Sequence, residues 1–425
     1  MNWALERTGT PSASVAIVMN GQVAFANAFG AARLTPATHA DAGMRYAIGS
    51  VSKQFTAAAI LLLVEDGKLN LSDPVSKFMP DLTQSNEVTI RMLLSHTSGY
   101  SDYWPQDYVM TDMMLPTRPI DIIAKWAKRP LDFSPGTKWQ YSNTNYVIAG
   151  RIVEQLSNQQ LFAFLSARIF EPLAMSSVYD VNERALPSTD PAGYYRHALG
   201  PLRLAPKEGR GWLFAAGELS MTASDLAKWD ISLINRSLLK PESYNEMFKE
   251  VKLKDGTGTS YGLGVDVHQR KGHQYIEHSG EVSGFTSKNT VILDRKAAVV
   301  ALANEDAVTT PVIIAASLAP SLAGQSAGES RALQLLKQLQ ANQLDRTQLT
   351  PFCSAYFTEE ALRDFSTSLR PLGEPLFLTE QFTTQRGGMT YRGFRVQFPD
   401  RALTLSTYEM PDGKLEQFLV APSPP

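Results

Sequence analysis

Segments with the character of β-strands lie at both ends of a long, largely helical stretch of this chain. Residues 14–19 and 22–29 are strand-like and are joined by Asn20-Gly21, a strong signal for a β-hairpin turn. Later strand-like segments, separated by Gly-rich turns, span residues 261–267, 273–277, 285–293 and 297–303. Strands at both ends with helices between predict an α+β fold: one antiparallel sheet built from two distant parts of the chain, flanked by helices, with a helical region inserted.

A second, smaller unit is expected after this sheet. Residues 309–322 resemble a closing helix, and the Gly/Ser-rich stretch that follows is typical of a linker. Beyond it, the pattern predicts amphipathic helices over 332–344 and 359–369 and strands over 377–384, 389–398, 402–408 and 414–420. We therefore expect a domain over residues 1–323, a linker over 324–330 and a small α+β domain over 331–425, in which no motif indicates a role.

Composition and charge limit the partners. The chain has 425 residues, 44% hydrophobic and 19% charged, so it can bury a sizeable core. The net charge is −2, and the sequence has no basic stripe that could bind phosphates, which argues against a nucleic-acid partner. The longest apolar run, residues 57–64, is too short to span a bilayer. We expect a small-molecule or peptide substrate; the sequence does not indicate an oligomeric state.

Cysteine and histidine usage indicates neither a disulfide nor a metal site. Cys353 is the only cysteine. His268, His273 and His278 recur every five residues, a spacing that alternates between the faces of a strand, so they should not converge on a metal. No cofactor is expected. The N-terminal residues carry no signal-peptide pattern, so the protein is either cytoplasmic or begins after a removed signal, with a periplasmic or secreted location slightly favoured.

Ser50-Val51-Ser52-Lys53 opens an apolar helix and places a hydroxyl and an amine one turn apart. A serine needs a nearby base to become a nucleophile at neutral pH, and a desolvated lysine can be that base. Ser50 should lie at the helix N-terminus, where the dipole favours a developing negative charge. The pattern is weak alone, since Ser237-Leu238-Leu239-Lys240 repeats it in a predicted turn. It indicates a serine hydrolase only if partners exist.

Tyr141-Ser142-Asn143 is the first candidate partner. It follows the turn signal Ser134-Pro135-Gly136 and precedes a predicted helix over residues 143–156. A phenol beside a cationic lysine has its ionised form favoured, so Tyr141 can serve as general base for Ser50 and later as acid. Asn143 can hold both Lys53 and a substrate amide. A turn with a buried tyrosine is the alternative.

His278-Ser279-Gly280 is the second candidate, at the end of a strand-like run. Glycine here lets a substrate lie close to the backbone like an added strand. The N–H of Glu281 can pair with that of Ser50 to stabilise an oxyanion. An ordinary hairpin end with a hydrogen-bonded histidine is the alternative.

Further segments complete a resemblance to a known family. They are residues 94–99 (Leu-Ser-His-Thr-Ser-Gly), 64–69 with 73–75, Pro135-Gly136 before Tyr141, and Ala216-Gly217 through 222–226. Together with the three motifs, they resemble the serine β-lactamase and penicillin-binding-protein superfamily, in its class C β-lactamase-like branch. The resemblance covers roughly residues 10 to 322 and leaves the C-terminal segment outside it.

That resemblance implies an acyl-enzyme mechanism with Ser50 as nucleophile, Lys53 and Tyr141 sharing proton transfer, and Asn143 positioning. His278-Ser279-Gly280 falls where many members have Lys-Thr-Gly, and this departure weakens a cationic anchor for a substrate carboxylate. Members with histidine there resemble D-alanyl-D-alanine carboxypeptidases and D-aminopeptidases. The resemblance therefore favours an amide or peptide substrate, which can contain D-amino acids. A family VIII-type carboxylesterase or a class C β-lactamase is the alternative.

Aromatic side chains also cluster in loops near these motifs and either wall an acyl-group pocket or pack in the core. They are Tyr100, Tyr103, Trp104, Tyr108, Trp212 and Phe214.

Two other readings stay open. Residues 258–262 formally fit the nucleophile elbow of an α/β-hydrolase, although strand-like sequence follows where that elbow requires a helix. A penicillin-binding sensor that is acylated without turnover is the non-enzymatic alternative, and the intact Ser50, Lys53, Tyr141 and Asn143 argue against it.

Overall fold

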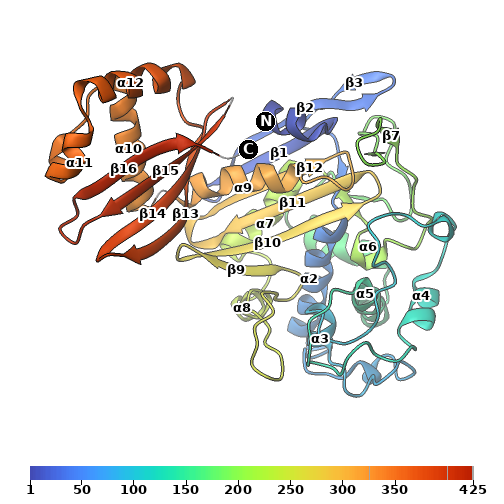
Figure 1. The fold of residues 1–425 in the computed structure, drawn as a ribbon. Coiled ribbons are helices and arrows are strands. Elements are labelled where there is room, and N and C mark those ends of the chain that lie inside the picture. Colours follow the sequence, from blue (N-terminus) through green and yellow to red (C-terminus); the bar gives the residue numbers. More distant parts are fainter. Residues whose placement is uncertain (325, 400, 424–425) are drawn as a thin grey trace. The chain divides into compact units, whose positions relative to one another are not determined.

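The computed structural model describes residues 1–324, 326–399 and 401–423, which form two compact units, Met1–Leu322 and Ala323–Pro425. The first unit contains a seven-stranded antiparallel sheet in the order β3-β2-β1-β12-β11-β10-β9 (Figure 1). Its strands are β1 (Ser12–Met19), β2 (Gln22–Leu34), β3 (Ala37–His39), β9 (Asp266–Arg270), β10 (His273–Val282), β11 (Phe285–Ile292) and β12 (Ala297–Ala303).

The two ends of this unit meet in the middle of the sheet, because β1 pairs with β12 in antiparallel register from Ala13↔Ala303 to Val18↔Ala298. Asn20 and Gly21 both have positive φ angles (52° and 74°), as a tight hairpin turn between β1 and β2 requires. The predicted antiparallel sheet is confirmed. The predicted strand over 261–267 is wrong in its first half: Gly264 (φ +75°) turns the chain against the backbone of Lys53, and β9 starts at Asp266.

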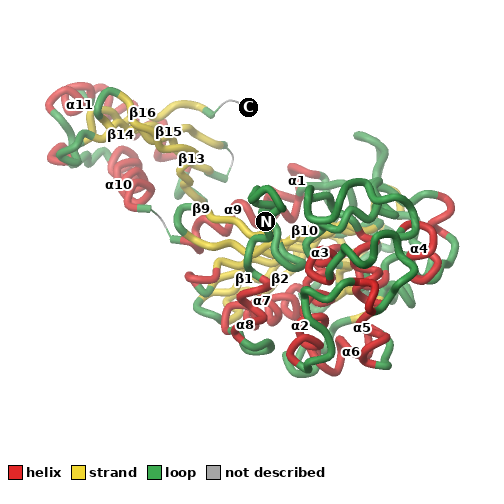
Figure 2. Tube along the Cα trace, turned by 90° about the horizontal axis from the view of Figure 1, so that it is seen from below, coloured by secondary structure: helices red, strands yellow, loops and turns green. Residues whose placement is uncertain are grey.

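Both faces of the sheet are covered (Figure 2). On one face, Val15 and Ala301 pack with Leu5 of α1 (Asn2–Thr8) and Ile314 of α9 (Thr310–Ala323). On the other face, alternate residues of the same strands join the main core, which includes α2 (Ser52–Glu65), α5 (Asn143–Ser157) and α7 (Ala223–Asn235). This alternation is the period of two that a strand buried on both faces produces.

Helices supply most of the regular secondary structure of the inserted region between β2 and β9, as predicted, but loops and turns make up much of its length. Thr89 caps α3 by accepting a hydrogen bond from the backbone N–H of Met92. The remaining elements are α3 (Ile90–Leu94), α4 (Pro119–Trp126), α6 (Leu161–Leu165), α8 (Pro241–Met247), β4 (Tyr46–Ala47), β5 (Tyr179–Asp180), β6 (Tyr194–Tyr195), β7 (Arg203–Leu204) and β8 (Leu219–Met221).

The C-terminal unit is an antiparallel meander, β13 (Phe377–Arg386), β14 (Met389–Gln397), β15 (Ala402–Glu409) and β16 (Leu415–Pro422), with α10 (Ala327–Ala341), α11 (Pro351–Tyr356) and α12 (Glu359–Leu369). Leu335, Leu336 and Leu339 of α10 share one core with Phe394 and Phe418 of the sheet. The linker expected over 324–330 is too long: Ser326 and Glu329 form a capping box, so α10 already begins at Ala327.

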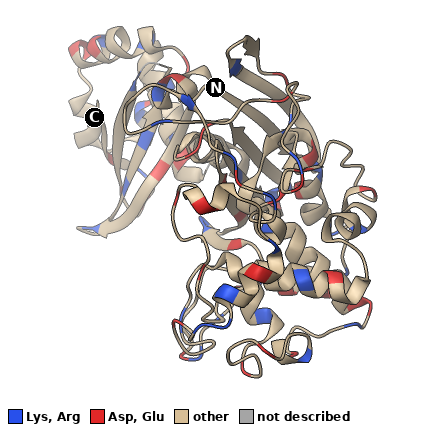
Figure 3. Cartoon of the chain, turned by 90° about the vertical axis from the view of Figure 1, so that its right-hand side faces the viewer, with Lys and Arg blue, Asp and Glu red and all other residues tan. Residues whose placement is uncertain are grey.

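Basic and acidic side chains are interspersed along both units (Figure 3). Among the described residues, none of the helices is both long and apolar enough to cross a membrane. The part of the chain that the structure describes also contains no group of three His, Cys, Asp or Glu side chains able to hold a metal ion.

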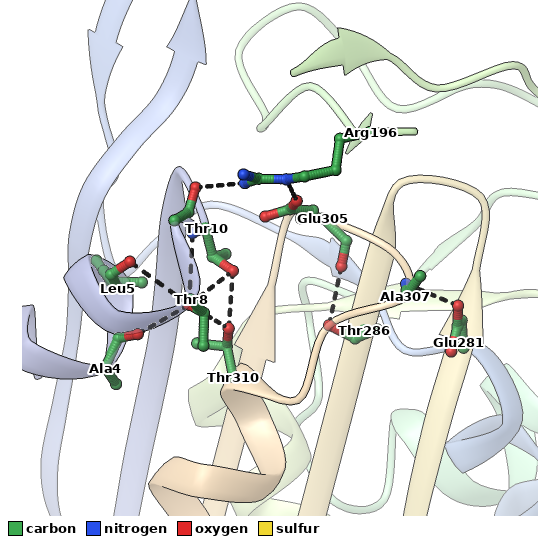
Figure 4. A network of polar contacts seen from close by, with 11 residues as sticks. Ala4, Leu5, Thr8, Thr10, Arg196, Glu281, Thr286, Glu305, Ala307 and Thr310 are labelled. Carbon is green, nitrogen blue, oxygen red and sulfur yellow. Dashed lines mark hydrogen bonds and ion pairs between the residues drawn. The ribbon is translucent and has the colours of Figure 1, made fainter. Parts of the chain in front are cut away.

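The loop between β12 and α9 is fixed by a buried ion pair (Figure 4). The Arg196 guanidinium donates to the fully buried Glu305 carboxylate at 2.6 Å and to the Gly9 carbonyl at 2.8 Å. Thr286 donates to the Glu305 carbonyl, and the N–H of Ala307 donates to the Glu281 carboxylate at the end of β10. The pair therefore holds a loop that borders the end of β10.

Arg196→Met removes the cation and keeps a side chain of comparable length. We expect the free energy of unfolding to fall by about 3–5 kcal/mol, because the buried Glu305 carboxylate is left uncompensated. Urea unfolding measures the change. Arg168→Met, which breaks the more exposed pair with Asp66, is the matched control and should cost at most about 1 kcal/mol. Equal losses in the two variants would contradict this role of the buried pair.

Candidate active site

Ser50 lies in a single 3-10 turn, Gly49–Val51, that leads directly into α2. Lys53, one turn further on, is fully buried, and its Nζ lies 2.9 Å from the Ser50 Oγ and 2.7 Å from the Ala216 carbonyl oxygen. The structure therefore brings the predicted hydroxyl and amine into direct contact.

Burial lowers the pKa of Lys53 to about 7, and the nearby Asp102 carboxylate opposes this shift. Desolvation disfavours the charged form of an amine. A large fraction of Lys53 is consequently neutral at pH 7 and carries a lone pair that can accept the Ser50 proton.

The end of β10 packs against the Ser50 turn at a distance that excludes side chains between them. A Cβ on Gly280 would lie 2.0 Å from the Ile48 carbonyl oxygen, and one on Gly49 (φ +49°) would lie 2.7 Å from the Glu281 nitrogen. Glycine at both positions lets the Glu281 backbone lie directly beside the Ser50 turn.

Tyr141 precedes α5, and its ring centroid lies 5.0 Å from the Lys53 Nζ. Its hydroxyl is buried and has no hydrogen-bond partner among the described residues. Burial raises the pKa of Tyr141 above its ordinary value, although the neighbouring Ser50 lowers it in part. The prediction that the lysine favours an ionised phenol is therefore wrong in the resting site: desolvation outweighs a partner that is itself largely neutral.

Asn143, the first residue of α5, is held by a carboxylate that the sequence did not single out. Its backbone N–H and its Nδ2 donate to Asp102 at 2.9 and 3.2 Å. Asn143 makes no hydrogen bond with Lys53 among the described residues, so that predicted contact is wrong. Asp102 lies in the loop that follows Gly99, whose φ angle is +87°. Burial raises the pKa of Asp102.

His278 is buried and has no free ring nitrogen. Its Nε2 lies 2.8 Å from the Tyr261 hydroxyl, and its Nδ1 lies 2.5 Å from the Ser279 carbonyl oxygen. A carbonyl only accepts, so the neutral ring carries its proton on Nδ1 and accepts from Tyr261 at Nε2. Burial lowers the pKa of His278 to about 4, so it is uncharged at neutral pH.

A cleft of about 850 Å³ opens onto Ser50. Tyr103 and Trp104 line it, whereas Tyr100 and Trp212 do not: the Tyr100 hydroxyl donates to Thr83, and the Trp212 indole donates to Leu115. The other predicted residues that line it are Tyr108, Tyr141, Asn143, His278, Ser279, Gly280 and Glu281. Trp139, Tyr261, Asp266 and Asp306 line it as well and were missed. Trp139 and Asp306 lie in loops without a motif, and Tyr261 and Asp266 fell within the predicted strand over 261–267.

The charged side chains of this cleft are all acidic. They are Asp102, Asp107, Asp266, Glu281 and Asp306. No Lys or Arg side chain is among the described residues that line the cleft. Ser260 of the elbow-like pattern lies outside the lining, and β9 rather than a helix follows it, so the α/β-hydrolase interpretation is wrong.

An antiparallel sheet flanked by helices, with a serine and a buried amine in contact at the foot of a cleft, defines a hydrolase of the β-lactamase fold. Residues 4–320 match the family described as Beta-lactamase, and the chain belongs to that family. It is 28% identical over 301 residues to "Penicillin-binding protein 4*" of Bacillus subtilis (strain 168), covering 67% of this chain and 66% of that protein. The chain thus spans about two thirds of that relative's length.

Solved structures agree with this assignment. A D-stereospecific amidohydrolase from Streptomyces sp. is similar with a TM-score of 0.64 at 26% identity, over 73% of this chain and 94% of that chain. The octameric penicillin-binding protein homologue from Pyrococcus abyssi is similar with a TM-score of 0.67 at 22% identity, over 99% of this chain and 97% of that chain. The second likeness shows the fold across both units.

Gly280→Ala tests the close approach of β10 to the Ser50 turn. We expect a loss of about 1–3 kcal/mol or more in the free energy of unfolding, because the added methyl meets the Ile48 carbonyl at 2.0 Å and the backbone has to move. Gly217→Ala is the matched control, since its Cβ would meet Val282 at an ordinary 3.5 Å. Thermal unfolding compares the two, and a Gly280→Ala protein as stable as the control would refute the constraint.

Proposed function

We propose that this protein is a serine hydrolase that cleaves an amide bond through an acyl-enzyme and that prefers a substrate with an amino group to one with a carboxylate. The contact between the Ser50 Oγ and a Lys53 whose pKa is about 7 carries the catalytic part of the proposal. A general base with a pKa near the working pH is largely unprotonated and is still basic enough to accept a proton.

Acylation begins when the Ser50 oxygen attacks the substrate carbonyl carbon and its proton passes to the neutral Lys53 amine. The resulting oxyanion accepts hydrogen bonds from the backbone N–H groups of Ser50 and Glu281. The C–N bond then breaks as the leaving nitrogen takes the hydroxyl proton of Tyr141, and the Lys53 ammonium returns a proton to the phenolate. The amine leaves, and the acyl group stays on Ser50.

Deacylation uses the same groups with water as the nucleophile. Water attacks the ester carbonyl and gives a proton to the Lys53–Tyr141 pair, and the Ser50 oxygen recovers a proton as the ester bond breaks. The carboxylic acid product leaves, and the site returns to its starting protonation state. The raised pKa of Tyr141 keeps the phenol protonated in the resting site, so its proton is available to the leaving nitrogen.

The substrate preference rests on the charges of the cleft. A carboxylate-bearing substrate requires a cation, but His278 is uncharged and the described lining holds five carboxylates and no Lys or Arg. These carboxylates favour an ammonium group instead. The similarity to a D-stereospecific amidohydrolase supports an amide substrate and suggests D-configured residues, whereas the free amine rests on the carboxylates of the cleft.

A panel of chromogenic substrates tests this choice. We expect sustained release of p-nitroaniline from free-amine D-amino acid anilides and much less from their N-acetylated forms or from acyl-D-Ala-D-Ala. Ser50→Ala should abolish turnover and fluorophosphonate labelling while circular dichroism stays unchanged. A preference for acyl-D-Ala-D-Ala or nitrocefin would overturn the substrate choice, and a single burst of acylation without turnover would identify a receptor.

The pH profile tests Lys53 as the base. Its pKa is lowered and its neutral form is the active one, so kcat/KM should rise about tenfold per pH unit at low pH and level off above about pH 7. Asp102→Asn removes the carboxylate that raises the pKa of Lys53, so the midpoint should move to lower pH. Asp121→Asn, an exposed carboxylate of α4, is the control. If the midpoint of the pH profile did not move in Asp102→Asn, Lys53 would not be the general base.

A further inference from the structure

His96 is a buried residue that the mechanism above does not use. It lies in the loop after α3, within the Leu-Ser-His-Thr-Ser-Gly segment, and is 0% exposed. Its φ angle of +59° is in the left-handed region, which few non-glycine residues adopt, although histidine does so more often than most.

Three contacts join His96 to the residues around Tyr141. Its Nδ1 accepts the backbone N–H of Ser142 at 3.1 Å, and its carbonyl accepts the backbone N–H of Gln140 at 3.0 Å. Its ring centroid lies 4.2 Å from that of Tyr141, with the ring planes 32° apart. The histidine therefore binds the residue on each side of the tyrosine and packs on the tyrosine ring itself.

The imidazole is more than a filler of space. Since Nδ1 accepts a hydrogen bond, the proton of the neutral ring is on Nε2, which is buried and has no partner among the described residues. An unpaired buried N–H destabilises the folded state. Asparagine would also accept the Ser142 N–H and adopts a positive φ easily, but its amide lacks the ring that packs on Tyr141.

The Tyr141 hydroxyl has no hydrogen-bond partner among the described residues, so its location depends on what holds the ring and its backbone. We infer that His96 is a positioning residue that places the Tyr141 hydroxyl for protonation of the leaving nitrogen, an inference that rests on the proposed function. It acts through Tyr141 and does not touch the substrate.

A pair of substrates with one acyl group and two leaving groups tests this role. An anilide needs a proton on its leaving nitrogen, whereas p-nitrophenolate leaves as an anion without one. In His96→Asn we expect kcat/KM, which reports acylation and not the shared deacylation step, to fall about 10- to 100-fold for the anilide and less than about threefold for the p-nitrophenyl ester. An equal loss on both substrates would show a structural role only and would overturn the inference.

A double-mutant cycle sharpens the test. Tyr141→Phe should reproduce the anilide-selective loss, and adding His96→Asn to it should have little further effect, because the hydroxyl is already gone. Additive losses would overturn the inference. Tyr100→Phe, which removes a buried hydroxyl bond outside the cleft, is the control and should leave the anilide-to-ester ratio unchanged.

A second variant and the wild-type activity distinguish misfolding and failure of the proposed function from failure of the role of His96. If His96→Asn does not fold, the same ratio is measured on His96→Gln, whose longer side chain fills more of the space of the ring. A wild-type protein that hydrolyses neither substrate refutes the proposed function, whereas one that hydrolyses both, with no change of ratio in the variants, refutes only the role of His96.

Discussion

The desolvation of one ammonium group governs the chemistry of this molecule. Lys53 lies on α2, whose residues from Ser52 to Leu63 are all buried, so its side chain is shielded from bulk solvent. The fold offers it a carbonyl, a hydroxyl and two aromatic rings, and no carboxylate in direct contact. These neighbours do not replace the hydration that the cation loses on burial, so desolvation lowers the pKa of Lys53 and favours the neutral amine. The seven-stranded sheet and the inserted helices together provide that enclosure.

Local sequence patterns were sufficient for the elements but not for their side-chain partners. The Asn20-Gly21 hairpin, the helix after Ser50 and the four C-terminal strands follow from turn chemistry and periodicity, which act over a few residues. The contact between Ser50 and Lys53 follows from helical geometry in the same way. The partner of Asn143 does not, because Asp102 lies on a separate loop and is brought to α5 only by tertiary packing.

Ionisation was harder to predict than position, since it depends on burial. A sequence shows that a phenol and an amine are both present, and it was natural to expect the amine to ionise the phenol. In the folded protein both groups lose water, and desolvation disfavours the ionised form of each. It lowers the pKa of the Lys53 amine and raises the pKa of the Tyr141 phenol, so both groups are favoured in their neutral forms. The same desolvation lowers the pKa of His278, so the histidine is uncharged at neutral pH. Tyr100 and Trp212 illustrate the equivalent problem for packing, because an aromatic ring near a motif can face either the core or the cleft.

The presence of histidine at position 278, where many members of the family have lysine, and the protonation of Lys53 are linked by electrostatics. The charged form of Lys53 lowers the pKa of His278, so the two groups lie close enough to interact. A lysine at position 278 would add a second cation beside Lys53 and lower the pKa of the base further, at the cost of basicity. With a neutral histidine there, the principal opposing charge is that of Asp102, which raises the pKa of Lys53 towards neutrality. Under the proposed function, a neutral histidine in place of a cationic anchor disfavours carboxylate substrates and leaves Asp102 to hold the pKa of the base near neutral pH.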